Sequence, residues 1–343
     1  MFILAARMAR DYSPKLEYLR SRRYDEALKE PILSEAFTST DYPDSVKYAL
    51  ESMVEIAPSY AYKVYSISKK IHEKLNKALK KRGYYADYRY QGELKTYSNI
   101  ILYGDVELMV IKKDISEKPH IAVQRLAMEL LEILRGDSDF KSVDYSDKTR
   151  IRITAMKPTC EIDILPSVWV DSLEFKQTKN EIYRGIAEFD FKKRKVKKYL
   201  PFLNIARINA RDQRTNGTFK SLSRLLKTLR ADSDARINLK DSEINAILYA
   251  MGEEKLKVEH SHLLSQLPKV EKLLEKITID STIFEGIPSP SGKDRVFTGL
   301  PEKQEEIGKL RENLSQLIED ISQDLSERNL RIESPFEYST LIN

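Results

Sequence analysis

The stretch YQGELKTYSNIILYGDVELMVIKK, residues 90 to 113, decides the fold of this chain. An aromatic, alternating segment over 84–91 leads into it and predicts a strand. Gly92 follows with a polar segment, which is typical of a turn. The apolar run 106–113 predicts a second strand. A strand, a glycine turn and a more apolar strand in this order predict the beginning of a sheet.

Two carboxylates, Asp105 and Glu107, stand where the second strand begins. Because side chains alternate along a strand, both face one side of the sheet, while Val106 and Leu108 face the other. An acidic pair of this kind is weak evidence alone, since chance produces it often and a solvated strand edge explains it equally well. The pair gains weight from the glycine turn before it and from a second acidic strand after it.

A predicted hairpin supplies this second acidic strand. Its arms are residues 150–156 and 160–170, with Lys-Pro-Thr at 157–159 as the turn. In the second arm, CEIDILPSVWV, Glu161 and Asp163 share one face and apolar side chains take the opposite one. The hairpin therefore presents a carboxylate face of its own.

If strands 106–113 and 160–170 are neighbours, Asp105, Glu107 and Asp163 converge. Three carboxylates at one point repel one another unless cations neutralise them. Two divalent metals about 4 Å apart would do so, and such a pair is the standard apparatus of in-line phosphoryl and nucleotidyl transfer. One ion would activate the attacking hydroxyl, and the other would hold a triphosphate and its leaving pyrophosphate.

The composition narrows the class of protein. The chain has 343 residues, 41% hydrophobic and 32% charged, which fits a globular protein of about two domains. Its apolar runs are too short to span a bilayer, and the N-terminal MFILAARMAR lacks the cleavage pattern of a signal peptide. A single cysteine, Cys160, excludes an intramolecular disulfide and fits a reducing cytoplasm. With only four histidines besides, carboxylates must hold any metal, which favours magnesium or manganese over zinc.

Helical patterns occupy most of the remaining sequence. Apolar residues recur every three or four positions, and a last helix begins at Pro301; the other predicted helices fall within 44–83, 119–135, 218–230, 241–251 and 261–277. The apolar stripe of the last helix is either a seam for assembly or a face packed on its own domain, and its shortness favours the second.

These patterns predict an α+β fold, with a small mixed or antiparallel sheet flanked by helices and a helical C-terminal domain. We expect an N-terminal helical segment over 1–57, the sheet domain over 58–180 and the helical domain over 181–343. The sequence after residue 180 is expected to be almost wholly helical. A cleft between the two larger domains is the usual place for a ligand.

Basic residues are clustered, although the formal net charge of +5 is mild. FKKRKVKK, residues 191–198, is a dense run, and Lys220, Arg224 and Lys227 share one face of a predicted helix. Polyanions are the natural partners of such clusters, so nucleic acid is a candidate partner for the 191–198 run. The alternative for both clusters is a solvated surface.

The order and spacing of these elements resemble the nucleotidyltransferase superfamily of DNA polymerase beta and the poly(A) polymerases. That superfamily carries a hydrophobic residue, Gly and then Gly or Ser, followed by Asp-hydrophobic-Asp/Glu-hydrophobic and by a third acid on a later strand. Gln91-Gly92-Glu93, Asp105-Val106-Glu107-Leu108 and Asp163 in EIDILPS stand at these positions. The IDILPSVWV segment and the FKSLSRLLK helix resemble bacterial cGAS-like nucleotidyltransferases of anti-phage signalling more closely still. The resemblance covers residues 60 to 300.

The resemblance implies roles for particular residues. Asp105, Glu107 and Asp163 would be the catalytic residues and the ligands of the metal. The glycine turn would lie against the triphosphate, where backbone N–H groups and a small hydroxyl are useful donors. The basic helix face would meet the phosphates across the cleft. The nucleotide-binding residues implied are Gly92, Glu93, Lys95, Thr96, Lys220, Arg224 and Lys227.

Two positions depart from the superfamily pattern. Glu93 stands where Ser or Gly is expected, and its carboxylate repels a triphosphate unless a metal or a lysine such as Lys95 intervenes. Glu107 is permitted in place of Asp, but its longer side chain alters the geometry of a metal site. These departures keep open a degenerate relative that binds nucleotides without catalysis.

The leading hypothesis is an enzyme. It would polymerise or cyclise nucleoside triphosphates into an oligonucleotide messenger for an effector protein in anti-phage defence, with release of pyrophosphate. The alternatives are a non-catalytic nucleotide or nucleic-acid sensor, a toxin-type nucleotidyltransferase acting on RNA, and a structural subunit that assembles through its last helix. The modest net charge argues against a dedicated binder of long RNA. The sequence leaves open the base and sugar, the cyclic or linear product, the primer, the activating signal and the oligomeric state.

Overall fold

The structure is a computed structural model that describes residues 10–25, 28–31, 42–113, 117–137, 139–146, 149–156, 159–190 and 194–327. These residues divide into two compact units. The first contains residues 56–209 and carries the main sheet, and the second combines residues up to 55 with those from 210 onward. The expected N-terminal segment is therefore part of the helical unit, and the sheet unit continues past residue 180.

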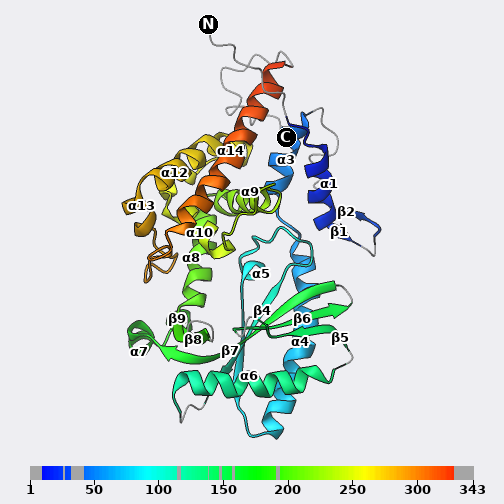
Figure 1. The fold of residues 1–343 in the computed structure, drawn as a ribbon, viewed down its shortest axis with the longest axis vertical. Helices are drawn as coiled ribbons and strands as arrows, with labels where there is room; N and C mark the ends of the chain where they lie inside the picture. Colours follow the sequence, from blue (N-terminus) through cyan, green and yellow to red (C-terminus); the bar gives the residue numbers. More distant parts are fainter. Residues whose placement is uncertain are drawn as a thin grey trace. The chain divides into compact units, whose positions relative to one another are not determined.

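Seven strands of the described chain form the main sheet, in the order β3-β4-β7-β6-β5, with β8 on β7 and β9 on β8 (Figure 1). Strands β4 and β7 run parallel, and the other neighbouring strands run antiparallel, so the sheet is mixed as predicted. The strands are β3 (Ala86–Gln91), β4 (Val106–Lys112), β5 (Phe140–Asp144), β6 (Ile151–Met156), β7 (Thr159–Asp171), β8 (Arg184–Asp190) and β9 (Lys195–Tyr199).

The predicted strands are confirmed at 84–91 and 106–113, and the predicted hairpin is the antiparallel pair β6–β7. Its turn residues 157–158 lie outside the described residues. The prediction of an almost wholly helical chain after residue 180 is wrong, because β8 and β9 extend the sheet. Strand β9 has mostly exposed lysines and pairs only with β8, and such lysine-rich edge strands show no alternating apolar pattern.

Two long helices pack on one face of the sheet, α4 (Pro58–Lys81) and α6 (Pro119–Arg135). Their apolar stripes form one core with the inward side chains of the strands; its members include Leu75, Leu79, Val106, Val110, Leu126, Leu130, Ile162 and Ile164. Val106 and Leu108 are therefore buried, as the alternation predicts. Leu108→Ala would lose about 2–5 kcal/mol of stability at such a site.

The opposite face of the sheet carries Glu107 and Asp163 at one end. Farther along the same strands, Met109, Ile111 and Leu165 pack with Ile186 of β8 in a second apolar cluster. Because β4 lies between β3 and β7, it is an interior strand. The solvated-edge explanation is thereby excluded for Glu107, whereas Asp105 precedes the strand and is exposed.

Short helices complete the sheet unit: α5 (Glu93–Thr96), η1 (Glu181–Tyr183) and α7 (Leu173–Thr178). Helix α8 (Pro201–Arg214) begins in this unit and ends in the other. None of the helices in the described ranges is both long and apolar enough to cross a bilayer.

The second unit is helical apart from the short strands β1 (Tyr24–Asp25) and β2 (Glu30–Pro31). Helix α14 packs against α12, α9 and α3. Its stripe of Ile307, Leu310, Leu314, Leu317 and Ile321 is fully buried, so the prediction that it packs on its own domain is confirmed. The predicted helix at 261–277 begins as the 3₁₀ segment η2 (His260–Gln266). The α-helices of this unit are α1 (Ser13–Arg22), α3 (Asp44–Met53), α9 (Thr218–Ala231), α10 (Asp241–Ala250), α11 (Glu253–Leu256), α12 (Leu267–Ile279), α13 (Ser281–Gly286) and α14 (Glu302–Glu327).

Candidate active site

The parallel pairing of β4 with β7 brings two of the predicted carboxylates together. Glu107 and Asp163 are direct partners in the register, so their side chains stand next to each other on one face. Asp105 is exposed and immediately precedes β4. The prediction that the two acidic strands are neighbours is thus confirmed. Asp163 is the most deeply placed of the three, with 2% of its surface exposed.

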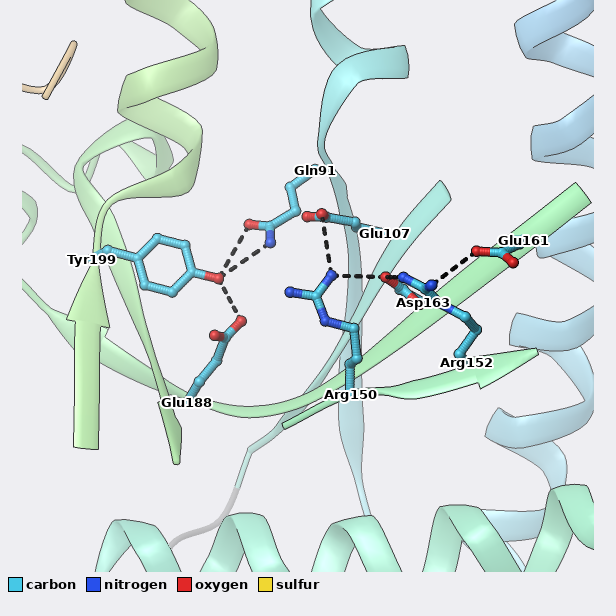
Figure 2. A network of polar contacts seen from close by, with 8 residues as sticks. All are labelled: Gln91, Glu107, Arg150, Arg152, Glu161, Asp163, Glu188 and Tyr199. Carbon is cyan, nitrogen blue, oxygen red and sulfur yellow. Dashed lines mark hydrogen bonds and ion pairs between the residues drawn. The ribbon is translucent and has the colours of Figure 1, made fainter. Parts of the chain in front are cut away.

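Two arginines bind the buried Asp163 (Figure 2). Arg152, its antiparallel partner on β6, donates from Nε to Oδ1 at 2.9 Å and from Nη2 to Oδ2 at 3.1 Å. Arg150 donates from Nη1 to Oδ2 at 2.7 Å. Charge-assisted and bidentate hydrogen bonds of this kind are strong and fix the orientation of a carboxylate. Asp163 consequently accepts three arginine hydrogen bonds.

Arg150 also faces the neighbouring carboxylate. Its Nη1 lies 3.8 Å from Oε1 of Glu107, so one guanidinium stands between the two acids. Burial raises the pKa of Glu107, and the charges of Asp163 and Glu188 raise it further. Arg150 and a hydrogen bond from Gln91 act in the opposite direction. The protonation of the Glu107 carboxylate therefore depends on the cation that lies next to it.

Gly92 forms the turn above Glu107. Its backbone has φ 90° and ψ −167°, a conformation that is essentially restricted to glycine. A Cβ built on Gly92 would lie 3.4 Å from both Cγ and Cδ of Glu107. The glycine is thus required both by the backbone and by its contact with the Glu107 side chain.

The residues after Gly92 form the short helix α5. Glu93 is its first residue, where an acidic side chain is favoured. The Nζ of Lys95 lies 5.2 Å from the ring centre of Tyr65 and 5.7 Å from that of Tyr90, within range of cation–π attraction. The Thr96 hydroxyl donates to the carbonyl of Glu93 at 3.0 Å. The Thr96 hydroxyl is thus bonded within α5, and the Lys95 ammonium lies near aromatic rings of α4 and β3.

A second polar group lies beside Glu107 on the same face. Tyr199 of β9 donates to Glu188 of β8, and its hydroxyl oxygen accepts a hydrogen bond from Nε2 of Gln91 at 3.2 Å (Figure 2). Burial and the Glu188 carboxylate raise the pKa of Tyr199 well above its usual value, so the phenol stays protonated. This contact of Tyr199 could not be predicted from the sequence, because β8 and β9 were not predicted as strands.

The two arginines were also missed, although the sequence contains their signal. In RIRITAM, Arg150 and Arg152 stand two residues apart, as Glu161 and Asp163 do in the facing arm. Paired strands with matching alternation place such residues on one face, and Arg152 indeed also meets Glu161 at 3.0 Å. The pattern R-x-R opposite E-x-D therefore predicts a ladder of ion pairs.

Arginines are the cations beside this acidic pair. Among the described residues, no group of three or more His, Cys, Asp or Glu side chains is arranged to hold a metal ion. The oxygens of Asp163 point at guanidinium groups, which neutralise it. The assignment of Asp105, Glu107 and Asp163 as metal ligands stays a prediction.

The basic face of α9 belongs to the helical unit. Arg224 and Lys227 are buried, with 4% and 0% of their surface exposed, which excludes a solvated face for these two residues. Arg224 donates from Nε to the carbonyl of Met53 at 2.7 Å, and its burial lowers its pKa to about 10. Lys220 lies 3.5 Å from the Asp212 carboxylate. Helix α9 thus holds positive charge inside its unit.

We expect Arg152→Ala to lower the free energy of unfolding by about 1–3 kcal/mol, because a buried acceptor loses two of its hydrogen bonds. Urea denaturation followed by circular dichroism measures this change. Arg82→Ala is the matched control, since it removes ion pairs to Glu129 and Glu132 at the surface, where such pairs contribute little. Equal losses for the two variants would contradict a structural role for Arg152 at Asp163.

Comparisons with known proteins find relatives that cover most of the chain. No family model matches the chain. The cyclic dinucleotide synthase CdnE of Yersinia aleksiciae is 26% identical over 336 residues, covering 91% of this chain and 88% of the relative. The structure of a STING-associated CdnE c-di-GMP synthase from Capnocytophaga granulosa superposes with a TM-score of 0.74 and 26% identity, over 90% of this chain and 97% of that one.

A second solved structure extends the likeness of the fold. It is a STING-associated CdnE c-di-GMP synthase from a Flavobacteriaceae species, with a TM-score of 0.73, 23% identity and coverage of 91% of this chain and 98% of that one. The two solved structures cover 90% and 91% of this chain. The chain is thus a cGAS-like nucleotidyltransferase of the DNA polymerase beta superfamily.

Proposed function

We propose that the protein joins nucleoside triphosphates into a cyclic dinucleotide with release of pyrophosphate. The observation that carries this proposal is the register of Glu107 and Asp163 on parallel strands beneath the Gly92 turn. This is the position at which the superfamily places its acidic centre. The relatives support the product class, because the Yersinia aleksiciae protein is a cyclic dinucleotide synthase and the Capnocytophaga granulosa protein is a c-di-GMP synthase.

The substrate that these relatives favour is GTP. A c-di-GMP synthase joins two guanosine nucleotides, and the protein from Capnocytophaga granulosa covers nearly the same chain length as this one. We propose GTP as the first nucleotide to test and an effector protein that reads the product. The predicted cytoplasmic location and the toxin-type activity on RNA stay predictions.

The proposal assigns the remaining predicted residues to the triphosphate. The Gly92 turn, with Glu93, Lys95 and Thr96, is proposed to line it from the sheet unit. On α9, Lys220, Arg224 and Lys227 are proposed as further nucleotide-binding residues, by the resemblance to the superfamily alone. The proposed cofactor is magnesium, with manganese as the alternative, bound at the acidic centre of Asp105, Glu107 and Asp163.

One observation favours the sensor as a second candidate function. The carboxylate Asp163 is saturated by arginines, and a site that keeps this arrangement could bind a nucleotide without transferring it. The basic run at 191–198 would serve such a sensor. Its residues 194–198 are exposed on and before β9, whereas residues 191–193 lie outside the described ranges.

Incubation of the purified protein with labelled nucleotides separates these functions. Each ribo- and deoxyribonucleoside triphosphate is supplied alone and in pairs, with magnesium or manganese, and products are resolved by size and phosphatase resistance. We expect a phosphatase-resistant dinucleotide from GTP, absent from a Glu107→Gln/Asp163→Asn double variant. Metal-dependent nucleotide binding without product from any nucleotide would favour the sensor instead.

A further inference from the structure

Glu107 is flanked by Asp163 on β7 and by Gln91 on β3. Gln91 and Glu107 are direct partners in the antiparallel pairing of β3 with β4, so their side chains lie next to each other. Gln91 also donates a hydrogen bond to the Glu107 carboxylate. A side-chain amide has a donor end and an acceptor end, and only the donor end can bond to a charged carboxylate. The orientation of this amide therefore determines whether Gln91 holds or repels Glu107.

Residues of β8 and β9 fix that orientation (Figure 2). The hydroxyl of Tyr199 on β9 donates its single hydrogen to Glu188 of β8. The Tyr199 oxygen is then left to accept, and it accepts from Nε2 of Gln91 at 3.2 Å. Because an amide nitrogen carries two hydrogens, Gln91 can donate to Tyr199 and to Glu107 together. The donor end of the amide is thereby the end that Tyr199 binds.

We propose that Tyr199 is a positioning residue of the active site, and that it holds the Glu107 carboxylate in place through the amide of Gln91. Glu188 sets the direction of the hydrogen bonds in this chain, because an ionised carboxylate accepts and does not donate. This inference rests on the proposed function, in which Glu107 belongs to the catalytic centre. It assigns to β9, the strand that the sequence did not predict, a part in the chemistry at β4.

The surroundings of these groups preserve the arrangement. Burial and the Glu188 carboxylate raise the pKa of Tyr199 well above its usual value, so the phenol keeps the hydrogen that it donates. Gln91 is buried, with 9% of its surface exposed, so water competes little for its amide. In a partly buried network each hydrogen bond polarises the next one. Loss of the Tyr199 hydroxyl should therefore affect Glu107, at the far end of the chain of hydrogen bonds.

Steady-state kinetics of GTP turnover tests the catalytic part of the inference. Tyr199→Phe keeps the ring and removes only the hydroxyl. We expect it to lower kcat on the order of tenfold and to leave the KM for GTP within a factor of about two, because the hydroxyl orients a catalytic group.

Tyr88→Phe is the matched control. Tyr88 lies on β3, the strand of Gln91, and its buried hydroxyl has no hydrogen-bond partner among the described residues. Both kcat and KM should therefore keep their wild-type values in this variant. Equal effects of the two substitutions, or a change in KM alone for Tyr199→Phe, overturn the proposal.

A thermodynamic cycle tests the coupling without relying on catalysis. Urea denaturation gives the unfolding equilibrium constants of the wild type, Tyr199→Phe, Glu107→Gln and the double variant. We expect the effect of the double variant to differ from the product of the single effects by a factor of about five. The difference should vanish when Gln91→Met is present in all four proteins.

The outcomes of the cycle separate this inference from the proposed function. Independent effects of Tyr199→Phe and Glu107→Gln overturn the proposal, and so does a coupling that persists with Gln91→Met, whether or not the protein makes product. A coupling that depends on Gln91, in a protein that makes no product from any nucleotide, supports the positioning of Glu107 and rejects the proposed function instead.

Discussion

Asp163→Asn is expected to reduce product formation on the order of a thousandfold or more. The change replaces an anionic oxygen by an amide at the centre of the acidic pair and leaves Arg150 and Arg152 with a neutral partner. Loss of the charge that organises phosphoryl transfer removes several kcal/mol of transition-state stabilisation, and about 4 kcal/mol corresponds to a thousandfold in rate. Initial rates of pyrophosphate release from GTP measure the effect.

Asp171→Asn is the control for this variant. Asp171 lies at the end of the same strand, is partly exposed and forms an ion pair with Arg184. The same chemical change at this position should leave the rate within a factor of about two, because exposed ion pairs contribute little. A folded Asp163→Asn enzyme that retains a tenth of the wild-type rate would remove Asp163 from the catalytic centre.

Gly92→Ala is expected to cause the second large effect. The backbone at Gly92 is essentially forbidden to other residues, which predicts a loss of about 1–3 kcal/mol of stability. The added methyl group would also meet Glu107 at 3.4 Å and press on its side chain. A displacement of about 1 Å in a catalytic group can reduce the rate about a hundredfold, so we expect activity to fall by that order even at temperatures where the variant is folded.

Two other glycines separate backbone strain from the contact with Glu107. Gly83 also has a positive φ, of 78°, but nothing lies within 4 Å of an added Cβ, so Gly83→Ala should lose stability and keep its rate. Gly136 has a φ of −90° and open space around it, so Gly136→Ala should change neither. Denaturation curves and initial rates are compared for the three variants. An active Gly92→Ala enzyme would mean that the turn tolerates displacement of Glu107.

The sheet face of the site could be predicted because alternation is a local property. The alternation of Glu107 with Val106 and Leu108, and that of Asp163 with Ile162 and Ile164, follows from the strand geometry alone. That the two strands are neighbours was a further assumption, and their pairing confirms it. The apolar partners that force this pairing come from α4 and α6, whose stripes were also visible in the sequence.

The other groups of the site depend on contacts between segments that are distant in the sequence. No local sequence pattern predicts these contacts. The arginines act through their position opposite Asp163, which is known only once β6 is placed in register with β7. Tyr199 and Glu188 depend on the pairing of β8 with β9, and β9 is a lysine-rich charged segment without an alternating apolar pattern. On α9, the helical spacing of Arg224 and Lys227 is compatible with a solvent-exposed face as well as with a buried one. Only the packing of the helical unit shows that both residues are buried.

The parallel pairing of β4 with β7 also sets when the site can form. Parallel strands cannot be joined by a tight turn, so α6 and the strands β5 and β6 must be made between them. During synthesis, all of these elements are therefore made after Glu107 and before Asp163 leaves the ribosome. Contacts between segments so distant in the chain also form slowly, because their loop must close first. An incomplete chain that ends before β7 thus carries half of the acidic pair, and the catalytic centre is a late product of folding.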